Sequence, residues 1–315
     1  MTEENARNTK AGDALHEATR KIYEKQHQRI AGDDSVFNRI ARSYSAEKLK
    51  VPADWFAGKI ALDAGCGNFG ALTVKLAELG CAKIHACDIG TDWIPKLAAN
   101  LISKGVPEST FELRDGNVVN LPYPDAMFDF VAVNGVLVHL KDMEEIERGF
   151  VEGARVCRKG GYYFTSWGPS GGLVQGRILP AARQHYREDE WFKALIDNVS
   201  PQLIHGVIDK ICEDSEKNGG EKLDGAYLKS LFGEDFCVFL QNFIQAPQWW
   251  TNECTPEVVE GFYKKYGFVK IERLNEFVKR TDIRKYFAPL HYDWNHPVSK
   301  ALYGNGYVKY IAVKA

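Results

Sequence analysis

The stretch KIALDAGCGNFG, residues 59–70, constrains the fold of this chain more than any other. Its short apolar run, residues 60–62, is typical of a strand buried on both faces of a parallel sheet. Asp63 follows, and Gly65-Cys-Gly67 predicts a tight turn. A helix with three leucines on one face comes next and ends at Gly80. Because glycine lacks a Cβ and the first amides of a helix are free to donate, strand, turn and helix together predict a ligand cradle.

Two cofactor patterns fit this cradle. Gly65, Gly67 and Gly70 satisfy G-x-G-x-x-G, the dinucleotide fingerprint. Asp63, Gly65 and Gly67 also satisfy D-x-G-x-G, the first motif of S-adenosylmethionine (SAM) methyltransferases. A glycine triplet alone does not separate the two, so the rest of the chain must decide.

Short apolar strands alternate with amphipathic helices along much of the chain, which predicts an α/β fold with a doubly wound, mostly parallel sheet. Ligands of such sheets bind at the carboxyl ends of the strands, where Asp63, Asp88, Gly116-Asn117 and Asn134-Gly135 stand. The expected strands are 60–64, 83–88, 110–115, 129–134, 161–167, 267–274 and 307–313, and the expected helices are 11–30, 36–44, 70–79, 91–104, 142–158 and 257–266.

Four segments are expected. Residues 1–50 form an N-terminal helical cap segment and 51–167 the cofactor-binding core. Residues 168–255 lose the alternation and carry eight Lys/Arg against thirteen Asp/Glu, which predicts an acidic helical insertion over the substrate. Residues 256–315 complete the sheet. Their last two strands are joined by a long loop, 279–304, with a charge of +3 and no clear helix, which suggests a terminal antiparallel pair.

Composition excludes several classes of protein. A net charge of −2 provides no field for nucleic acid or an anionic membrane. The seven cysteines are scattered, without C-x-x-C or zinc spacing, so we expect reduced thiols, no metal and a cytoplasmic protein. The acidic, polar N-terminus argues against a signal peptide, and no apolar run has the length of a membrane span.

The order of several motifs decides between the cofactors. A dinucleotide requires a second mononucleotide-binding half, and a long insertion follows the fifth strand here instead. The chain resembles the class I SAM-dependent methyltransferases, most closely the ubiquinone/menaquinone-methyltransferase-like (type 11) branch, over about residues 36–167 and 256–314. The resemblance rests on FNRIARSY (37–44), LDAGCG (62–67), ACDI (86–89), DGNVVNLPYPD (115–125), FDFVAVNGVLVH (128–139), RKGG (158–161) and YGF (266–268).

This resemblance implies a seven-stranded sheet with an antiparallel last strand, SAM as cofactor, and a set of cofactor-binding residues. Asp88 would accept from the ribose hydroxyls, Asp63 would orient the amino group, and Tyr44 would close over the carboxylate. Alternatively, Asp88 would only cap a helix, and Asp63 and Tyr44 would have only structural roles. The whole implied set is Tyr44, Asp63, Gly65, Cys66, Gly67, Asp88, Ile89, Asn117, Val118 and Asn134.

The chain departs from the family pattern at two positions. Phe69 stands where the family has a third glycine, and Gly70 follows one residue later, where the helix begins. Asn117 replaces the family's adenine-contacting aspartate, and its amide oxygen retains the ability to accept from an adenine amino group.

The function that the resemblance implies is methyl transfer to a small-molecule acceptor, by in-line displacement with release of S-adenosylhomocysteine. Another SAM-dependent reaction on the same fold, or a SAM-binding protein without turnover, is the alternative. The acidic insertion, and the absence of N-P-P-Y or D-P-P-Y after the fourth strand, disfavour a nucleic-acid substrate.

Substrate residues are expected near the sulfonium methyl and in the insertion. His139 would take a proton from the acceptor or would only pack at a helix start. Trp249 and Trp250 would line an acceptor pocket or pack the insertion core. Arg280 and Arg284, four residues apart, would share a helical face and bind an acceptor carboxylate, or would pair with the acidic insertion.

Overall fold

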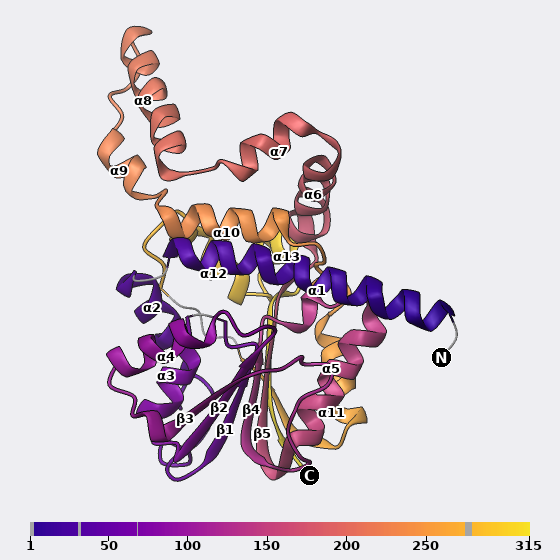
Figure 1. Ribbon diagram of the computed structural model, residues 1–315. Helices are drawn as coiled ribbons and strands as arrows, with labels where there is room; N and C mark the ends of the chain where they lie inside the picture. Colours follow the sequence, from indigo (N-terminus) through magenta and orange to yellow (C-terminus); the bar gives the residue numbers. More distant parts are fainter. Residues whose placement is uncertain (1–2, 31–32, 68, 275–278) are drawn as a thin grey trace.

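The computed structural model describes residues 3–30, 33–67, 69–274 and 279–315. Seven strands form one sheet in the order β3-β2-β1-β4-β5-β7-β6, with β7 antiparallel to both of its neighbours (Figure 1). This confirms the predicted α/β class and the antiparallel last strand. The strands are β1 (Ile60–Ala64), β2 (Lys83–Asp88), β3 (Phe111–Asp115), β4 (Phe128–Asn134), β5 (Cys157–Ser170), β6 (Phe268–Arg273) and β7 (Gly306–Lys314).

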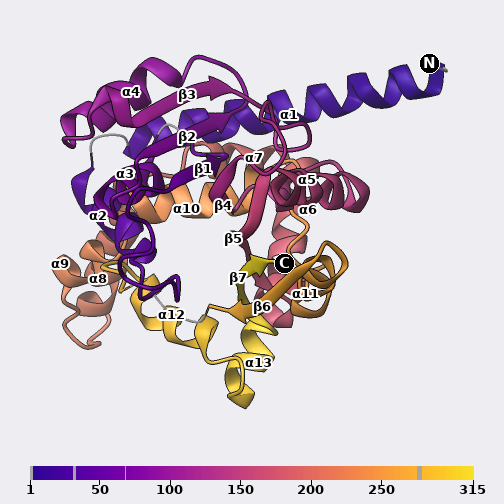
Figure 2. The same cartoon turned by 90° about the horizontal axis from the view of Figure 1, so that it is seen from below.

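Helices cover both faces of the sheet (Figure 2). On one face, α3 (Ala71–Glu78) and α4 (Ile94–Ser103) contribute their buried leucines to the core. On the other, α5 (Met143–Val156) and α11 (Pro256–Lys265) pack aromatic and aliphatic side chains against β4, β5 and β7. Apart from Asp63, Asp129 and Asn134, the central strands β1 and β4 are therefore apolar, because both of their faces are buried.

The carboxyl edge of the sheet lies under helices from two distant parts of the chain (Figure 1). The first part is α1 (Glu3–Ile30) and α2 (Asp34–Ala41). The second comprises α6 (Leu179–Glu188), α7 (Glu190–Asp197), α8 (Pro201–Lys217), α9 (Gly225–Ser230) and α10 (Glu234–Gln245). α1 runs beside α10, and Gln26 Nε2 donates to Gln245 Oε1 at 2.7 Å. Residues 168–255, called the cap below, thus contribute helices above the sheet.

The connection between the last two strands differs from the sequence-based expectation. Residues 279–304 contain two helices, α12 (Arg284–Tyr292) and α13 (Pro297–Tyr303). Pro289 lies inside α12, and an internal proline normally argues against a helix, which explains why the pattern was missed. α13 has a recognisable start, because the His296 side chain accepts from the Val298 N–H and Pro297 follows as the first helical residue.

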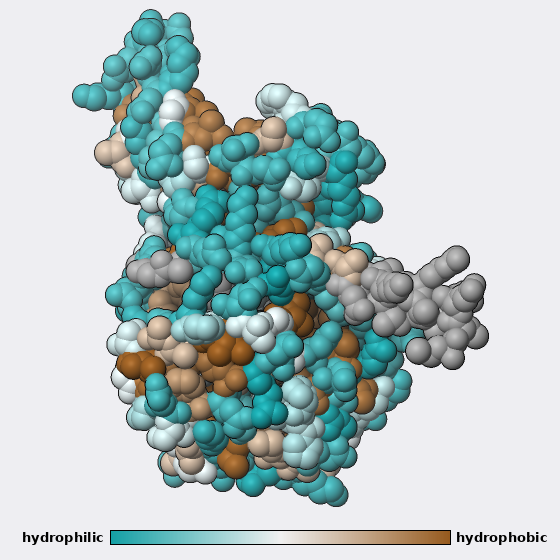
Figure 3. All heavy atoms as spheres, in the orientation of Figure 1, coloured by the Kyte–Doolittle hydropathy of each residue, from teal (hydrophilic) through white to brown (hydrophobic). Residues whose placement is uncertain are grey.

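Shorter helical segments complete the architecture: 3₁₀ turns at Arg42–Tyr44, Glu108–Thr110 and Leu137–His139, and a π-helical segment at Val174–Ile178. Across the described ranges, no helix combines the length and the apolar character that a membrane crossing requires. All seven cysteines lie in these ranges, and each has a free thiol. Figure 3 shows a mostly hydrophilic surface over the protruding α8–α9 part of the cap.

Candidate active site

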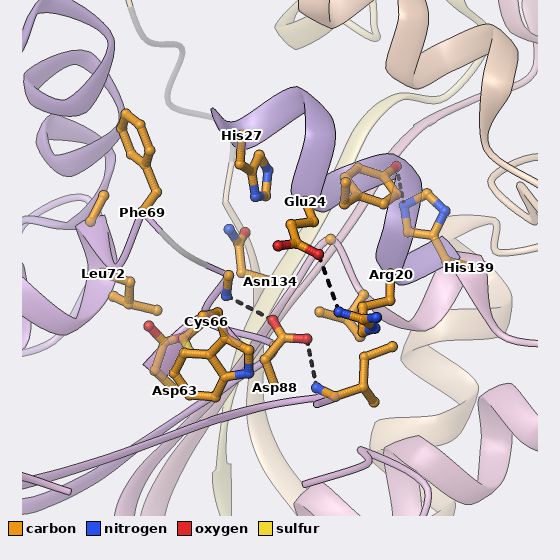
Figure 4. Close-up of a pocket in the computed structure, with 18 of the residues that line it drawn as sticks. Arg20, Glu24, His27, Asp63, Cys66, Phe69, Leu72, Asp88, Asn134 and His139 are labelled. Carbon is orange, nitrogen blue, oxygen red and sulfur yellow. Dashed lines mark hydrogen bonds and ion pairs between the residues drawn. The ribbon is translucent and has the colours of Figure 1, made fainter. Parts of the chain in front are cut away.

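A cavity of about 330 Å³ lies at the carboxyl ends of β1, β2 and β4 (Figure 4). Its floor is the glycine turn after β1, and its roof is α1, which contributes Thr19, Arg20, Tyr23, Glu24 and His27. Tyr44, Asp63, Asp88, Asn134 and His139 also line it. The sequence predicted Asp63, Asp88 and Asn134 at one sheet edge, and the fold brings them together with Tyr44 and His139.

The glycine turn adopts a backbone that other residues resist. Gly65 has a φ of 81°, and a Cβ there would stand 2.2 Å from Val136 Cγ2. Gly67 has a φ of 58°, and Gly70, with a φ of 56°, immediately precedes α3. The turn therefore keeps its amides close to the cavity and starts the helix one residue after Gly70. Cys66 lies between the two glycines, and burial holds the pKa of its thiol well above the ordinary value.

Asp88, at the end of β2, is fixed by the turn that it faces. Its two carboxylate oxygens accept from the N–H groups of Gly67 and Ile89, each at 2.8 Å. Burial nevertheless raises its pKa, and the carboxylate of Asp115 has the same effect. Each oxygen retains lone-pair capacity toward the cavity, which suits a diol such as a ribose.

Asp63 is 2% exposed, and its Oδ2 accepts from Thr73 Oγ1 at 2.8 Å. Burial raises its pKa to about 7, and Asp88 adds to the rise. Nearby, the Tyr44 hydroxyl accepts from Asn134 Nδ2 at 2.7 Å, so its proton is left to donate to a ligand. A carboxylate and a hydroxyl donor on one wall fit the ammonium and carboxylate ends of an amino acid.

A smaller cavity of about 60 Å³ adjoins the first and shares Gly65, Asp88 and Ile89 with it. Val118 and Asn117 line this extension. The side-chain oxygen of Asn117 already accepts from the Val119 N–H at 3.1 Å, so an adenine amino group would use its second lone pair. The fit to a nucleoside joined to an amino acid therefore extends over both cavities.

His139 does not present a free nitrogen to the cavity. Its Nδ1 lies 3.1 Å from the Gln248 carbonyl oxygen, and its Nε2 lies 2.9 Å from the Tyr23 hydroxyl. A carbonyl only accepts, so Nδ1 carries the proton of the neutral ring and Nε2 accepts from Tyr23. Burial lowers the pKa of His139 to about 4, which favours this neutral form. Sequence reasoning treated Tyr23 only as part of an apolar helix face.

α1 is the largest part of the site that the sequence did not predict. Arg20 pairs with Glu17 and Glu24 on its own helix and with Asp92 after β2, at 2.8, 3.1 and 3.1 Å. His16 lies 3.1 Å from Glu145 of α5. The amphipathic pattern predicted that α1 exists, and only its tertiary contacts reveal that it covers the cofactor cavity.

Trp249 and Trp250 lie in the cap but not on the large cavity. Both line a separate cavity of about 240 Å³. The Trp249 ring meets the His139 ring edge-on, with centroids 5.0 Å apart. Trp250 donates from Nε1 to the Leu140 carbonyl at 2.8 Å and packs against the main core. Trp249 is therefore a wall between the two cavities, whereas Trp250 also has an evident structural role.

The expected pairing of Arg280 with Arg284 on one helical face is wrong. α12 begins at Arg284, and Arg280 precedes it. The Arg284 guanidinium is bound to Asp282 and to Asp235 of α10, the latter at 2.5 Å. Its hydrogen-bonding fork is thus occupied by carboxylates that join α12 to the cap, as the alternative interpretation expected. Neither arginine lines the cavities described above.

Known proteins match the part of the chain that builds this cavity. The family described as "Methyltransferase domain" matches residues 62–165, from the middle of β1 into β5. These residues form a methyltransferase domain. The match agrees with the resemblance of the motifs to class I SAM-dependent methyltransferases, and SAM, the cofactor of that family, is the ligand that the cavities fit.

Three curated relatives each match less than half of the chain. Demethylmenaquinone methyltransferase of Bacillus licheniformis is 29% identical over 47% of this chain and 59% of its own. The 27-O-demethylrifamycin SV methyltransferase of Amycolatopsis mediterranei is 29% identical over 44% and 49%, respectively. A probable S-adenosylmethionine-dependent methyltransferase of Mycolicibacterium smegmatis is 31% identical over 42% and 47%. The chain thus spans about half the length of these relatives. The family match, residues 62–165, leaves the cap outside.

Proposed function

We propose that this protein transfers a methyl group from SAM to a small-molecule acceptor in the cytoplasm. The observation that carries the proposal is the cavity of about 330 Å³ beneath α1, which joins a cofactor cradle to the Tyr23–His139 pair. A cavity of this size with a mostly apolar lining is typical of small-molecule sites. The free thiols of all seven cysteines are consistent with a reducing compartment.

In this proposal different residues of the cavity bind different parts of the cofactor. Asp88 binds the ribose hydroxyls, and Asn117 and Val118 flank the adenine. Asp63 and Tyr44 hold the amino-acid end, supported by Thr73 and Asn134. When bound, SAM supplies a methyl group that is already activated by its sulfonium. The protein therefore contributes mainly alignment, exclusion of water by α1, and removal of the acceptor's proton.

The proton passes through Tyr23 to His139. Tyr23 Oη accepts the proton of an acceptor hydroxyl while its own proton moves to His139 Nε2, 2.9 Å away. The resulting imidazolium donates from Nδ1 to the Gln248 carbonyl. A charged intermediate on tyrosine is avoided, which matters because burial raises the pKa of Tyr23. In this proposal His139 is the final proton acceptor, and Tyr23 is the group in contact with the methyl acceptor.

Cofactor binding provides the first test. Asp88→Ala is expected to weaken SAM binding by about 1.5–3 kcal/mol, because a carboxylate bound to two hydroxyls is lost. Isothermal titration calorimetry measures this. Asp125→Ala is the control, since Asp125 is 78% exposed and pairs only with Arg155. Release of S-adenosylhomocysteine from a metabolite pool would establish turnover. SAM binding without such release would support the non-catalytic alternative.

The proton transfer from Tyr23 to His139 predicts an effect on kcat rather than on SAM affinity. Tyr23→Phe is expected to lower kcat for the acceptor identified in that pool by about 10²–10⁴-fold, the usual contribution of a positioned base. SAM affinity should change little, because Tyr23 contacts the acceptor end of the cavity. The control is Tyr227→Phe, on α9 and 43% exposed. An unchanged kcat would exclude Tyr23 from proton transfer.

A further inference from the structure

The 240 Å³ cavity in the cap contains a buried charge that no acid neutralises. It is lined by side chains from the π-helical segment 174–178, from α6 and from the segment after α10, among them Gln175, Arg183, Arg187, Trp249 and Asn252. It shares no lining residue with the cofactor cavity. Two of its lining residues contact His139: the Trp249 ring, with centroids 5.0 Å apart, and the Gln248 carbonyl.

Arg183 is 7% exposed and donates to two backbone carbonyls, of Phe243 and Ala246, each at 2.6 Å. No carboxylate in the described part of the chain forms an ion pair with it. Burial, and then the neighbouring charge of Arg187, lower its pKa to about 10. A buried cation without a counter-ion is unfavourable, so the site is electrostatically complementary to an anion.

Arg187 brings a second cation to the same cavity. It lies one helical turn after Arg183, is exposed, and donates to the Pro247 carbonyl at 3.1 Å. Like charges at this spacing repel each other, and a bound anion would relieve the repulsion. Glu253 stands at the exposed rim, and within the described ranges it is paired with neither arginine. Two arginines and one glutamate leave a net charge of +1, which matches a monoanion.

Two buried polar side chains of the cavity also lack partners. The Nε1 of Trp249, a donor only, binds no acceptor in the described structure. Gln175 is 3% exposed, and its Oε1 has no partner. Turning the Gln175 amide would present its N–H groups instead. Buried polar groups are normally satisfied, so these two indicate a ligand with acceptor oxygens.

We infer that the cap cavity binds the carboxylate of the acceptor, whose apolar or aromatic body extends past Trp249 toward Tyr23 and His139. This rests on the proposed function, since it names the acceptor's class. A single carboxylate matches the net charge and the planar fork of a guanidinium. The Trp249 indole packs against the rings of Phe243 and His139, with centroids 4.6 and 5.0 Å away, and the Arg183 guanidinium lies 5.6 Å from its centroid. No hydrogen bond of its indole N–H prevents this ring from turning aside.

Binding of a model acid tests the inference without knowledge of the acceptor. The probes are 3-phenylpropionate and its neutral amide, titrated into the full chain and followed by calorimetry. The acid is expected to bind about tenfold more tightly than the amide. Arg187→Gln should remove most of this difference and leave amide binding unchanged. The matched control is Arg177→Gln, an exposed arginine outside the cavity.

Two further measurements keep the test decisive. The indole N–H resonance of Trp249, assigned by Trp249→Phe, should shift with the acid and not with the amide. Equal binding of acid and amide, or an acid affinity indifferent to Arg187→Gln, would overturn the inference. SAM affinity, titrated separately, should be unaffected by Arg187→Gln. Loss of SAM binding by the unaltered protein would instead refute the proposed function itself.

Discussion

Asp63→Asn is expected to stabilise the ligand-free protein and at the same time to weaken SAM binding. The carboxyl is 2% exposed, and its burial raises the pKa to about 7 from an ordinary value of 3.8. Between these values the folded protein holds a proton that the unfolded chain has released. The free energy of unfolding therefore falls as pH rises through this window, and the full penalty is present above about pH 7.

Removing the ionisable group removes that penalty. We expect Asp63→Asn to raise the free energy of unfolding by about 1–3 kcal/mol at pH 8, with little change at pH 4, measured by urea denaturation. The asparagine retains an oxygen to accept from Thr73, so the hydrogen bond is kept. SAM affinity should fall by about tenfold or more, because a charge-assisted contact to the cofactor's ammonium is lost.

The pH dependence of SAM binding distinguishes this account from a packing effect. In the unaltered protein the affinity should rise from pH 6 to pH 8, as Asp63 loses its proton, and in Asp63→Asn this component should disappear. Thr73→Val should move the midpoint to higher pH, because the Thr73 hydrogen bond lowers the pKa of Asp63. A pH-independent affinity in the unaltered protein would show that Asp63 is not the group that meets the ammonium.

Arg284→Gln is expected to destabilise the protein by about 3–5 kcal/mol, the range for breaking a buried ion pair on one side. Its side chain is 11% exposed and those of Asp282 and Asp235 are 9% and 21% exposed, so two carboxylates would lose a partner in a poorly solvated place. Arg39 also binds Asp235, at 2.8 Å, and the network joins α2, α10 and α12. Thermal or urea denaturation measures the loss.

Two neighbouring substitutions serve as comparisons. Lys285→Gln alters only contacts with the rings of Tyr227 and Tyr286 and should change stability by about 0.5 kcal/mol or less. Arg280→Gln should be neutral or stabilising, because burial and the nearby Arg39 and Arg284 lower the pKa of Arg280. If Arg284→Gln left stability intact and raised the acceptor KM, Arg284 would be a substrate residue rather than a link to the cap.

The core of the fold was predictable because its signals are local. The apolar runs of β1 and β4 and the leucine spacing of α3 follow from burial within a parallel sheet. The expected strands agree with the observed ones within a few residues, except that β5 extends further at both ends. α12 was missed because Pro289 argues locally against the helix that tertiary packing supports.

The cofactor end of the site was predictable for a topological reason. Parallel strands end at one edge, so Asp63, Asp88 and Asn134 had to meet there once the alternation was recognised. No comparable topological rule predicts which residues meet at the acceptor end of the site. Tyr23, His139 and Trp249 come from three unrelated segments, and no periodicity relates them.

The sequence by itself thus determined the sheet, the glycine cradle and the resemblance to methyltransferases, because strand burial and turn geometry are encoded within a few tens of residues. Only the tertiary structure showed that α1 covers the cofactor cavity, that Tyr23 occupies the nitrogen of His139, and that Arg284 is neutralised while Arg183 is not. The physical reason is that a side chain's charge, exposure and partners depend on what packs against it. In this protein those neighbours are up to about two hundred residues away in the sequence.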